Sequence, residues 1–264
     1  MRTFAEMDKK LTVIKVGGKI VEEKESLNAL LQEFATIKGP KILVHGGGRT
    51  ATALASQLGI ETKMVNGRRI TDADMLKVVT MVYGGLVNKQ IVAHLNALGI
   101  CALGLTGADM DIIRSHRREK GEVDYGFVGD VDYANGGLLS LLLQQHIVPV
   151  MAPLTHNGSG QILNTNADTI AAEVSKALAS FYEVTLVYCF EKKGVLRHPD
   201  DDDSVIPHIT ASSYARLKDE GVIQGGMIPK LDNSFAALQA GVSKVVITRV
   251  GQIGNPQLGT TIEL

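Results

Sequence analysis

Short apolar runs alternate along the chain with longer segments in which apolar residues recur every three to four positions. The short runs are rich in β-branched residues and predict strands at residues 11–16, 41–44, 147–152, 184–189 and 244–248. The longer segments predict helices at residues 27–37, 49–58, 166–179 and 229–240. Because the strands lack polar alternation, both of their faces are expected to be buried. This pattern predicts an α/β fold with a mainly parallel sheet between two helical layers.

One helical segment is much longer than the others and covers residues 71–98. It begins at Thr71-Asp72 and keeps apolar residues at i, i+3, i+4 and i+7. A glycine pair, Gly84-Gly85, interrupts it at a cost of about 1 kcal/mol per glycine relative to alanine. Two explanations stay open: a bend or close packing within the chain, or a close helix crossing at a subunit interface.

Three weaker features complete the pattern. Residues 124–132 predict a β-hairpin with turns at glycine. The four consecutive acids at residues 200–203 are typical of a solvated loop, and a metal site is the less favoured alternative. A boundary between two lobes is weakly marked near residues 175–185.

Composition narrows the class of protein without naming a reaction. The 264 residues carry a net charge of −1, so no overall field would attract nucleic acid or an anionic membrane. Cys101 and Cys189 lie in apolar runs without metal-ligand spacing and are expected to be buried, reduced thiols. No apolar stretch approaches the roughly 20 residues that span a bilayer, and the charged N-terminus does not resemble a signal peptide. A cytoplasmic protein is expected.

Glycine-rich turns follow the first two predicted strands, at Gly17-Gly18 and Gly46-Gly47-Gly48. At the carboxyl edge of a parallel sheet, such turns let backbone N–H groups approach an anion, although glycine also simply makes tight turns. Neither turn matches GxxxxGK[ST], nor GxGxxG followed by an acid about 20 residues later. A P-loop ATPase and a standard dinucleotide-binding dehydrogenase are therefore disfavoured.

Several polar residues stand where a site could form. Lys15 lies inside the first strand and needs an anionic partner, either a carboxylate or a phosphate. Lys230 follows paired glycines at a predicted helix start, and two lysines that met would suit phosphoryl transfer. Asn164, Asn166 and Asp168 precede or open a helix, so they could cap it or form a polar site.

The order of these motifs resembles the amino acid kinase family. K-x-G-G begins at Lys15, followed by H-G-G-G, N-G-x-R ending at Arg69, N-K at Asn88, N-x-N-A-D ending at Asp168 and G-G-M-x-P-K ending at Lys230. The resemblance covers residues 11–264. It implies a three-layer αβα open sandwich with about eight strands. Residues 1–178 would form an N-terminal lobe that binds an acyl amino acid and dimerises, and residues 179–264 a lobe that binds ATP.

The resemblance also implies roles for individual residues. Lys15 and Lys230 would stabilise the transferring phosphoryl group, Asp168 would orient both lysines, and backbone N–H groups of Gly18 and Gly47 would bind phosphoryl oxygens. Gly47, Gly48, Arg69 and Asn164 would contact the substrate, with Arg69 on its α-carboxylate. Contacts to the nucleotide would come from Glu191, Gly194, Val195, Leu196, Val222, Ile223 and Gln224. Mg²⁺ would accompany ATP with little ligation by protein side chains.

The implied reaction is transfer of a phosphoryl group from ATP to the side-chain carboxylate of N-acetylglutamate, a step of arginine biosynthesis. N-succinylglutamate is an alternative substrate, because the basic stretch at residues 114–118 could supply an additional cation. Another kinase of the family, or a non-catalytic binding protein of this fold, is less favoured. In the stretch F-E-K-K-G-V-L, Glu191, Lys192 and Lys193 depart from the family's pattern, which leaves the adenosine contacts open.

The resemblance also bears on assembly. Only about ten residues precede the first strand, whereas arginine-inhibited relatives carry a longer N-terminal helix. We therefore expect a homodimer paired through the helix at residues 71–98, without arginine feedback.

Overall fold

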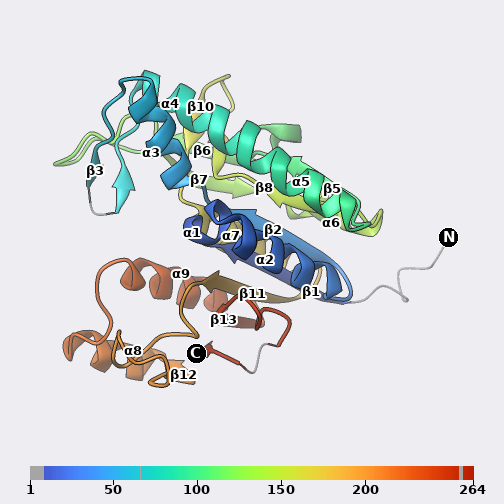
Figure 1. Ribbon diagram of the computed structural model, residues 1–264, viewed down its shortest axis with the longest axis vertical. Helices are drawn as coiled ribbons and strands as arrows, with labels where there is room; N and C mark the ends of the chain where they lie inside the picture. The colour runs from blue at the N-terminus through green and yellow to red at the C-terminus, as the bar shows by residue number, and fades with distance from the viewer. Residues whose placement is uncertain (1–8, 66, 256–257) are drawn as a thin grey trace.

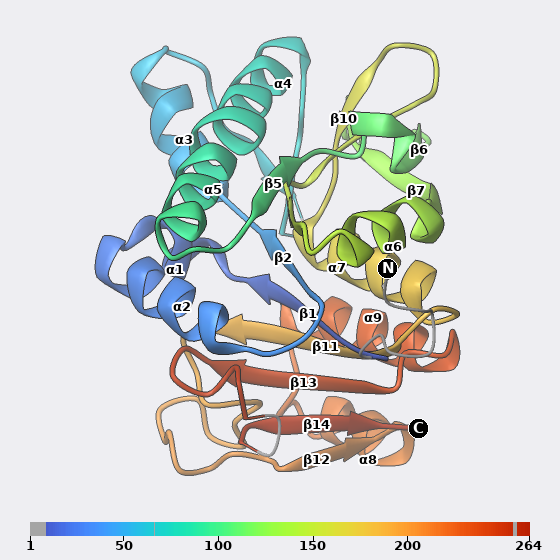
Figure 2. The same ribbon diagram turned by 90° about the vertical axis from the view of Figure 1, so that its right-hand side faces the viewer.

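The computed structural model describes residues 9–65, 67–255 and 258–264. Its main sheet has eight strands in the order β12-β14-β13-β11-β1-β2-β8-β5. All of them except β8 are labelled, from bottom to top, in Figure 2. The strands are β1 (Lys10–Val16), β2 (Lys41–His45), β5 (Ala102–Leu105), β8 (Val148–Met151), β11 (Glu183–Phe190), β12 (His208–Thr210), β13 (Lys244–Arg249) and β14 (Thr260–Glu263). All neighbouring pairs are parallel except β13 with β14. The predicted mainly parallel sheet of about eight strands is confirmed.

Two hydrophobic clusters cover the two faces of this sheet, and strand parity decides which side chain enters which cluster. In β1, Leu11 and Val13 join the cluster that contains α6, α7 and α9 side chains. Ile14 and Val16 join the other cluster, which contains side chains of α2, α4 and α5. The bounds are α1 (Gly18–Glu22), α2 (Lys24–Thr36), α3 (Gly48–Gln57), α4 (Ala73–Val79), α5 (Asn88–Ala97), α6 (Gly136–Gln144), α7 (Ala167–Leu178), α8 (Ala211–Asp219) and α9 (Met227–Gln239).

The long helical segment predicted at residues 71–98 is continuous from α4 to α5, but its centre is π-helical. Thr80–Val87 forms the π segment η2, which contains Gly84-Gly85. A β-carbon on Gly84 would lie 3.3 Å from Leu154 Cδ1, whereas one on Gly85 would meet nothing within 4 Å. Close packing within the chain thus accounts for Gly84 alone.

A second, four-stranded sheet has the order β10-β9-β6-β7. It consists of β6 (Ile113–Arg117), β7 (Gly129–Ala134), β9 (Leu154–His156) and β10 (Ile162–Asn164), and a separate hairpin pairs β3 (Met64–Val65) with β4 (Arg68–Arg69). The hairpin predicted within residues 124–132 is wrong in its bounds. The later part of that segment is β7, whose antiparallel partner is β6, outside the predicted segment.

The C-terminal third of the chain, orange to red in Figure 1, gathers at the lower end of the molecule. The predicted boundary between residues 178 and 179 coincides with the end of α7 at Leu178. One hydrophobic cluster nevertheless contains residues from both sides of that boundary, among them Val174 and Leu186. The division into lobes stays a prediction. Among the described residues, every helix is too short or too polar to cross a membrane. Residues 1–8, on which the expectation about the N-terminal segment falls, lie outside the described residues.

Both cysteines are free thiols. Cys189 is buried as predicted, but the prediction of burial is wrong for Cys101, which is exposed just before the edge strand β5.

Candidate functional site

Asp168 lies between the ammonium groups of two lysines. Lys15 Nζ is 2.8 Å from one carboxylate oxygen, and Lys230 Nζ is 2.7 Å from the other. Lys15 shares strand parity with Leu11 and Val13, so its side chain leaves β1 on the α7 side of the sheet. Asp168 stands in the first turn of α7 and Lys230 in the first turn of α9. The structure therefore brings together the two lysines and the aspartate that the sequence singled out.

The charges of these three residues do not cancel. Burial by itself would raise the pKa of the Asp168 carboxyl, but Lys15 and Lys230 together hold that pKa well below its usual value. Burial also lowers the pKa of the Lys230 ammonium, and the attraction of Asp168 opposes this change. The Tyr188 ring lies 4.8 Å from Lys230 Nζ and provides a cation–π contact. With Asp168 ionised and both lysines charged, the triad keeps one net positive charge that suits an anionic ligand.

The two glycine turns touch each other at the carboxyl edge of the sheet. A β-carbon added to Gly46 would lie 3.5 Å from Gly18 N, and one added to Gly18 would lie 3.9 Å from the backbone nitrogens of Gly47 and Gly48. Within the described residues, no acceptor is hydrogen-bonded to the N–H of Gly47 or Gly48. Gly47 is the N-cap of α3, so these free donors stand at the positive end of a ten-residue helix.

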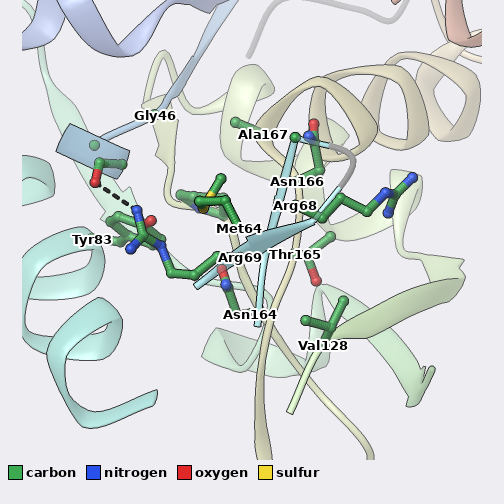
Figure 3. Close-up of a pocket in the computed structure, with 14 residues that line it drawn as sticks. Gly46, Met64, Arg68, Arg69, Tyr83, Val128, Asn164, Thr165, Asn166 and Ala167 are labelled. Carbon is green, nitrogen blue, oxygen red and sulfur yellow. Dashed lines mark hydrogen bonds between the residues drawn. The ribbon is translucent and has the colours of Figure 1, made fainter. Parts of the chain in front are cut away.

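A pocket of about 200 Å³ opens beside these turns (Figure 3). Four of the predicted substrate contacts line it: Gly47, Gly48, Arg69 and Asn164. Ala167, the residue before Asp168, also lines it, so the pocket adjoins the triad. The remaining lining residues are Gly46, Met64, Gly67, Arg68, Tyr83, Val128, Pro153, Thr165 and Asn166.

The Arg69 guanidinium is buried, with 8% of the residue exposed, and it points toward the second glycine turn in Figure 3. Its Nη2 donates to Gly48 O at 2.8 Å and to Thr52 Oγ1 at 2.9 Å, and its Nη1 donates to Thr62 Oγ1 at 3.3 Å. These acceptors are all uncharged. No carboxylate of the described residues forms an ion pair with Arg69, so its charge is available to an anion in the pocket.

The two asparagines of N-x-N-A-D have different roles. Asn166 is the N-cap of α7, and its side chain accepts hydrogen bonds from the backbone N–H groups of Asp168 and Thr169. Asn164 Nδ2 donates to Thr71 Oγ1 at 2.9 Å, which holds its side chain at the pocket wall. The helix-cap interpretation is therefore confirmed for Asn166. Asn164 caps no helix, and its contact with a substrate stays a prediction.

The predicted nucleotide contacts fall into a buried and an exposed group. Val195 and Ile223 are 3% and 1% exposed and belong to the hydrophobic core, so only their backbone could face a nucleotide. Gly194 and Leu196 pack near Val205. Glu191 and Gln224 are exposed and Val222 is half-buried. Their contacts with a nucleotide stay a prediction.

The departure at residues 191–193 has a structural counterpart in the acidic loop. Lys193 Nζ lies 2.6 Å from Asp203 Oδ1, and Lys192 Nζ lies 3.4 Å from Asp202 Oδ1. The additional lysines thus pair at the surface with two of the four acids at residues 200–203. The solvated-loop interpretation of the tract fits this arrangement.

Among the residues that the structure describes, no group of three or more His, Cys, Asp or Glu side chains is arranged to hold a metal ion. Both oxygens of Asp168, which follows the pocket-lining residue Ala167, are taken by lysines. A cation placed there would also be repelled by the two ammonium groups.

Sequence reasoning missed several residues of the site. Tyr83 packs against Gly47, since a β-carbon on Gly47 would lie 3.0 Å from Tyr83 Cδ1. In Figure 3, Arg68 leaves β4 on the side opposite to Arg69. Burial, and then the charge of Arg118, lower the pKa of Arg68. Arg68 could have been found from the sequence, because it directly precedes Arg69 in the N-G-x-R motif. Tyr83 could not, because it occupies an apolar position of the helical pattern like any core residue.

The fold and site thus define an α/β protein in which a triad of two lysines and one aspartate adjoins a small pocket lined by two free backbone N–H groups. A family model described as the amino acid kinase family matches residues 10–249. The chain belongs to this family.

A curated relative agrees with this assignment, and two solved structures share the fold. An acetylglutamate kinase of Phocaeicola vulgatus is 67% identical over 97% of this chain and 100% of its own. The carbamate kinase of Giardia lamblia bound to AMP-PNP is similar in fold, with a TM-score of 0.70 at 15% identity over 97% of this chain and 98% of its own. The N-acetylglutamate synthase of Neisseria gonorrhoeae has a TM-score of 0.82 at 21% identity, over 99% of this chain and 61% of its own.

Proposed function

We propose that this chain transfers the γ-phosphoryl group of ATP to the side-chain carboxylate of N-acetyl-L-glutamate, a step of arginine biosynthesis. The observation that carries the proposal is the triad, in which Asp168 holds Lys15 and Lys230 beside the pocket. The name acetylglutamate kinase, carried by relatives at 65–68% identity over most of this chain, supports the choice of acceptor.

In the proposed reaction, an oxygen of the substrate carboxylate attacks the γ-phosphorus. A new P–O bond forms while the bond to the β–γ bridging oxygen breaks, and its electron pair leaves with ADP. The carboxylate is already ionised at neutral pH, so no general base is needed. The protein's task is to neutralise charge on the phosphoryl oxygens, and Lys15, Lys230 and the N–H groups of Gly18 and Gly47 would do so.

Asp168 acts in this scheme as the residue that orients the lysines. A carboxylate with a strongly lowered pKa is a poor proton acceptor, so a role as base does not suit it. Its two oxygens instead determine where the two ammonium groups stand.

The substrate would lie in the pocket with its α-carboxylate on Arg69. The guanidinium is buried, charged and held by neutral acceptors, which is what recognition of a carboxylate requires. Asn164 would hydrogen-bond the substrate's amide group. The three arginines of residues 114–118 pair with other carboxylates: Arg114 with Asp111, Arg117 with Asp124 and Arg118 with Asp130. Since Arg68 still lines the pocket, we favour the N-acetyl substrate on the name of the relatives at 65–68% identity.

ATP would occupy the side of the triad formed by residues 179–264, near Gly194 and the 222–224 segment. Mg²⁺ would enter with the phosphates of ATP and supply charge neutralisation there. The described side chains provide no cluster that would hold it independently. As a biosynthetic enzyme of this kind, the protein would act in the cytoplasm.

Trapping of the product as a hydroxamate tests the proposal. With ATP, Mg²⁺ and hydroxylamine, we expect hydroxamate to form from N-acetylglutamate, and at least tenfold more slowly from N-succinylglutamate and free glutamate. Turnover of free glutamate alone would overturn the N-acyl assignment. Faster turnover of N-succinylglutamate than of N-acetylglutamate would identify N-succinylglutamate as the substrate instead.

We also propose a homodimer paired through the long helix. Met81 and Leu86 of the π segment are 51% and 48% exposed, and Gly85 between them would let another backbone approach. Sedimentation or light scattering should give twice the mass of the 28.2 kDa chain. Leu86→Lys should produce monomers, whereas Leu258→Lys, equally apolar and exposed but outside the helix, should not.

A further inference from the structure

His45, the last residue of β2, is completely buried and has a hydrogen-bond partner on each ring nitrogen. Its Nδ1 is 2.7 Å from Gly46 O, and its Nε2 is 3.1 Å from Asn88 Nδ2. Its strand parity is that of Leu43, so it points away from the triad and toward the long helix. The proposed mechanism gives this side chain no part.

The partners of Asn88 determine which ring nitrogen of His45 carries the proton. Val150 O can only accept, and it lies 2.9 Å from Asn88 Nδ2. The Lys89 ammonium can only donate, and it lies 3.2 Å from Asn88 Oδ1. The amide orientation follows from these two contacts. Its NH₂ group therefore also donates to His45 Nε2, which must be the unprotonated nitrogen. The proton is then on Nδ1 and is donated to Gly46 O.

The imidazole is neutral in this arrangement. Burial lowers the pKa of His45 to about 4, the hydrogen bond to Gly46 opposes that change, and the charge of Lys89 adds to it. Between pH 5 and 9 the ring is therefore expected to keep a single tautomer.

The bond to Gly46 O controls the direction of the next N–H group. The carbonyl of Gly46 and the N–H of Gly47 belong to one planar peptide unit, and in a trans unit they point in opposite directions. Anchoring the oxygen therefore also fixes where the N–H of Gly47 points. No protein acceptor takes that N–H among the described residues, and a β-carbon on Gly18 would lie 3.9 Å from its nitrogen.

The π segment brings a second side chain of the long helix to the same turn. Tyr83 packs on Gly47, and Asn88, five residues later, reaches His45. On an α-helix, five steps of about 100° would place these two side chains about 140° apart. A π-helix closes its hydrogen bonds at i+5, so residues five apart lie close to one face.

We propose that His45 is a positioning residue, which uses its Nδ1–H to hold the Gly46 carbonyl and so aims the N–H of Gly47 at the transferring phosphoryl group, with Asn88 selecting the tautomer. The inference rests on the proposed function, because it assigns Gly47 N–H to a phosphoryl oxygen. It adds His45 and Asn88 to the site and gives the π-helical segment a role, which is to bring Asn88 and Tyr83 to the same glycine turn.

Two variants separate the two ring nitrogens. In His45→Asn, the amide nitrogen falls near the former Nδ1 and can still donate to Gly46 O. In His45→Gln, the amide falls near the former Nε2 and meets Asn88, but it leaves Gly46 O without a donor. We expect kcat within about tenfold of the wild type for H45N and a decrease of about 100-fold for H45Q, the loss typical of one misplaced oxyanion donor. The KM for the acyl amino acid should change less than about threefold in both.

Equal loss of kcat in the two variants, or full activity of H45Q, would overturn the inference. Thermal midpoints of both variants show whether folding is equally affected.

A second measurement is independent of activity and folding of the variants. Long-range ¹H–¹⁵N correlations of the wild-type protein should show His45 neutral and protonated on Nδ1 from pH 8 to 5.5. Protonation on Nε2 would refute the inference. Failure of the proposed function would appear separately, as absence of hydroxamate from the wild type.

Discussion

Lys15 and Lys230 approach opposite oxygens of one carboxylate, at 2.8 and 2.7 Å, although one lies in the first strand and the other in the last helix. Each lysine is 13% exposed, so neither relies on water alone to balance its charge. The two ammonium groups are therefore held close to each other even without a ligand. Asp168 offsets their mutual repulsion, and an anionic phosphoryl group would relieve the rest.

Lys230→Ala should decrease kcat about 100- to 1,000-fold, because its charge is needed mainly as negative charge develops on the phosphoryl oxygens. Initial rates at saturating ATP and N-acetylglutamate measure the effect. Lys176→Ala is the matched control, since Lys176 pairs only with Glu173 on the surface of α7. An unchanged kcat in Lys230→Ala would remove this residue from the mechanism.

Asp168→Asn should lower the free energy of unfolding by about 3 kcal/mol at pH 7, since it leaves two ammonium groups without their anion. The pKa of Asp168 is lowered in the folded protein, so its stabilising effect is fully present above its unfolded value of about 3.9 and is lost as the pH falls through the folded value. In urea unfolding, the difference in unfolding free energy between wild type and variant should therefore be constant from pH 8 to 5. It should begin to shrink only below about pH 4.

Asp74→Asn is the control for that comparison, because its carboxylate pairs with Lys77 while 66% exposed. It should change stability by less than about 1 kcal/mol at any pH. A difference for Asp168→Asn that grew on acidification would contradict the assigned direction of the pKa change.

Arg69→Lys should raise the KM for N-acetylglutamate about 10- to 100-fold and leave the KM for ATP within about twofold. Lysine keeps the charge but lacks the planar fork that grips a carboxylate with two parallel hydrogen bonds. Steady-state kinetics with each substrate varied in turn gives both constants. Arg216→Lys, on the surface of α8, should alter neither. A selective rise in the KM for ATP would place Arg69 on the nucleotide instead.

Gly47→Ala should decrease both activity and stability. The residue has φ +154°, which is unfavourable for any side chain, and the added methyl would lie 3.0 Å from Tyr83 Cδ1. Strain of about 1–3 kcal/mol is expected, together with displacement of the N–H group at the site. Thermal unfolding and kcat report the two effects. Gly121→Ala, which meets nothing within 4 Å, should be close to neutral.

Much of the fold was predictable because the physical signals are local. Apolar strands without polar alternation predict a sheet buried on both faces, and β1, β2, β8, β11 and β13 lie within two residues of the predicted ranges. Strands β5, β12 and β14 were missed because they are only three or four residues long and lie at or near the edges of the sheet. The partner of β7 was missed because β6, I-R-S-H-R, carries its charges on an exposed face and does not look like a strand.

The candidate site divides in the same way. The sequence by itself determined the types of residue present: glycine turns after two strands, lysines where burial demands an anionic partner, and an asparagine cap ahead of Asp168. Only the tertiary structure decided which of these meet. Alternation along the strands places Lys15 on the face of the sheet covered by α7 and His45 on the opposite face. The sequence does not show which face a helix covers, because that depends on how the helix packs. Tyr83 and Asn88 come to one glycine turn through a π-helical segment whose apolar pattern was indistinguishable from that of an ordinary helix, because hydrogen-bond spacing, unlike hydrophobicity, is settled by packing.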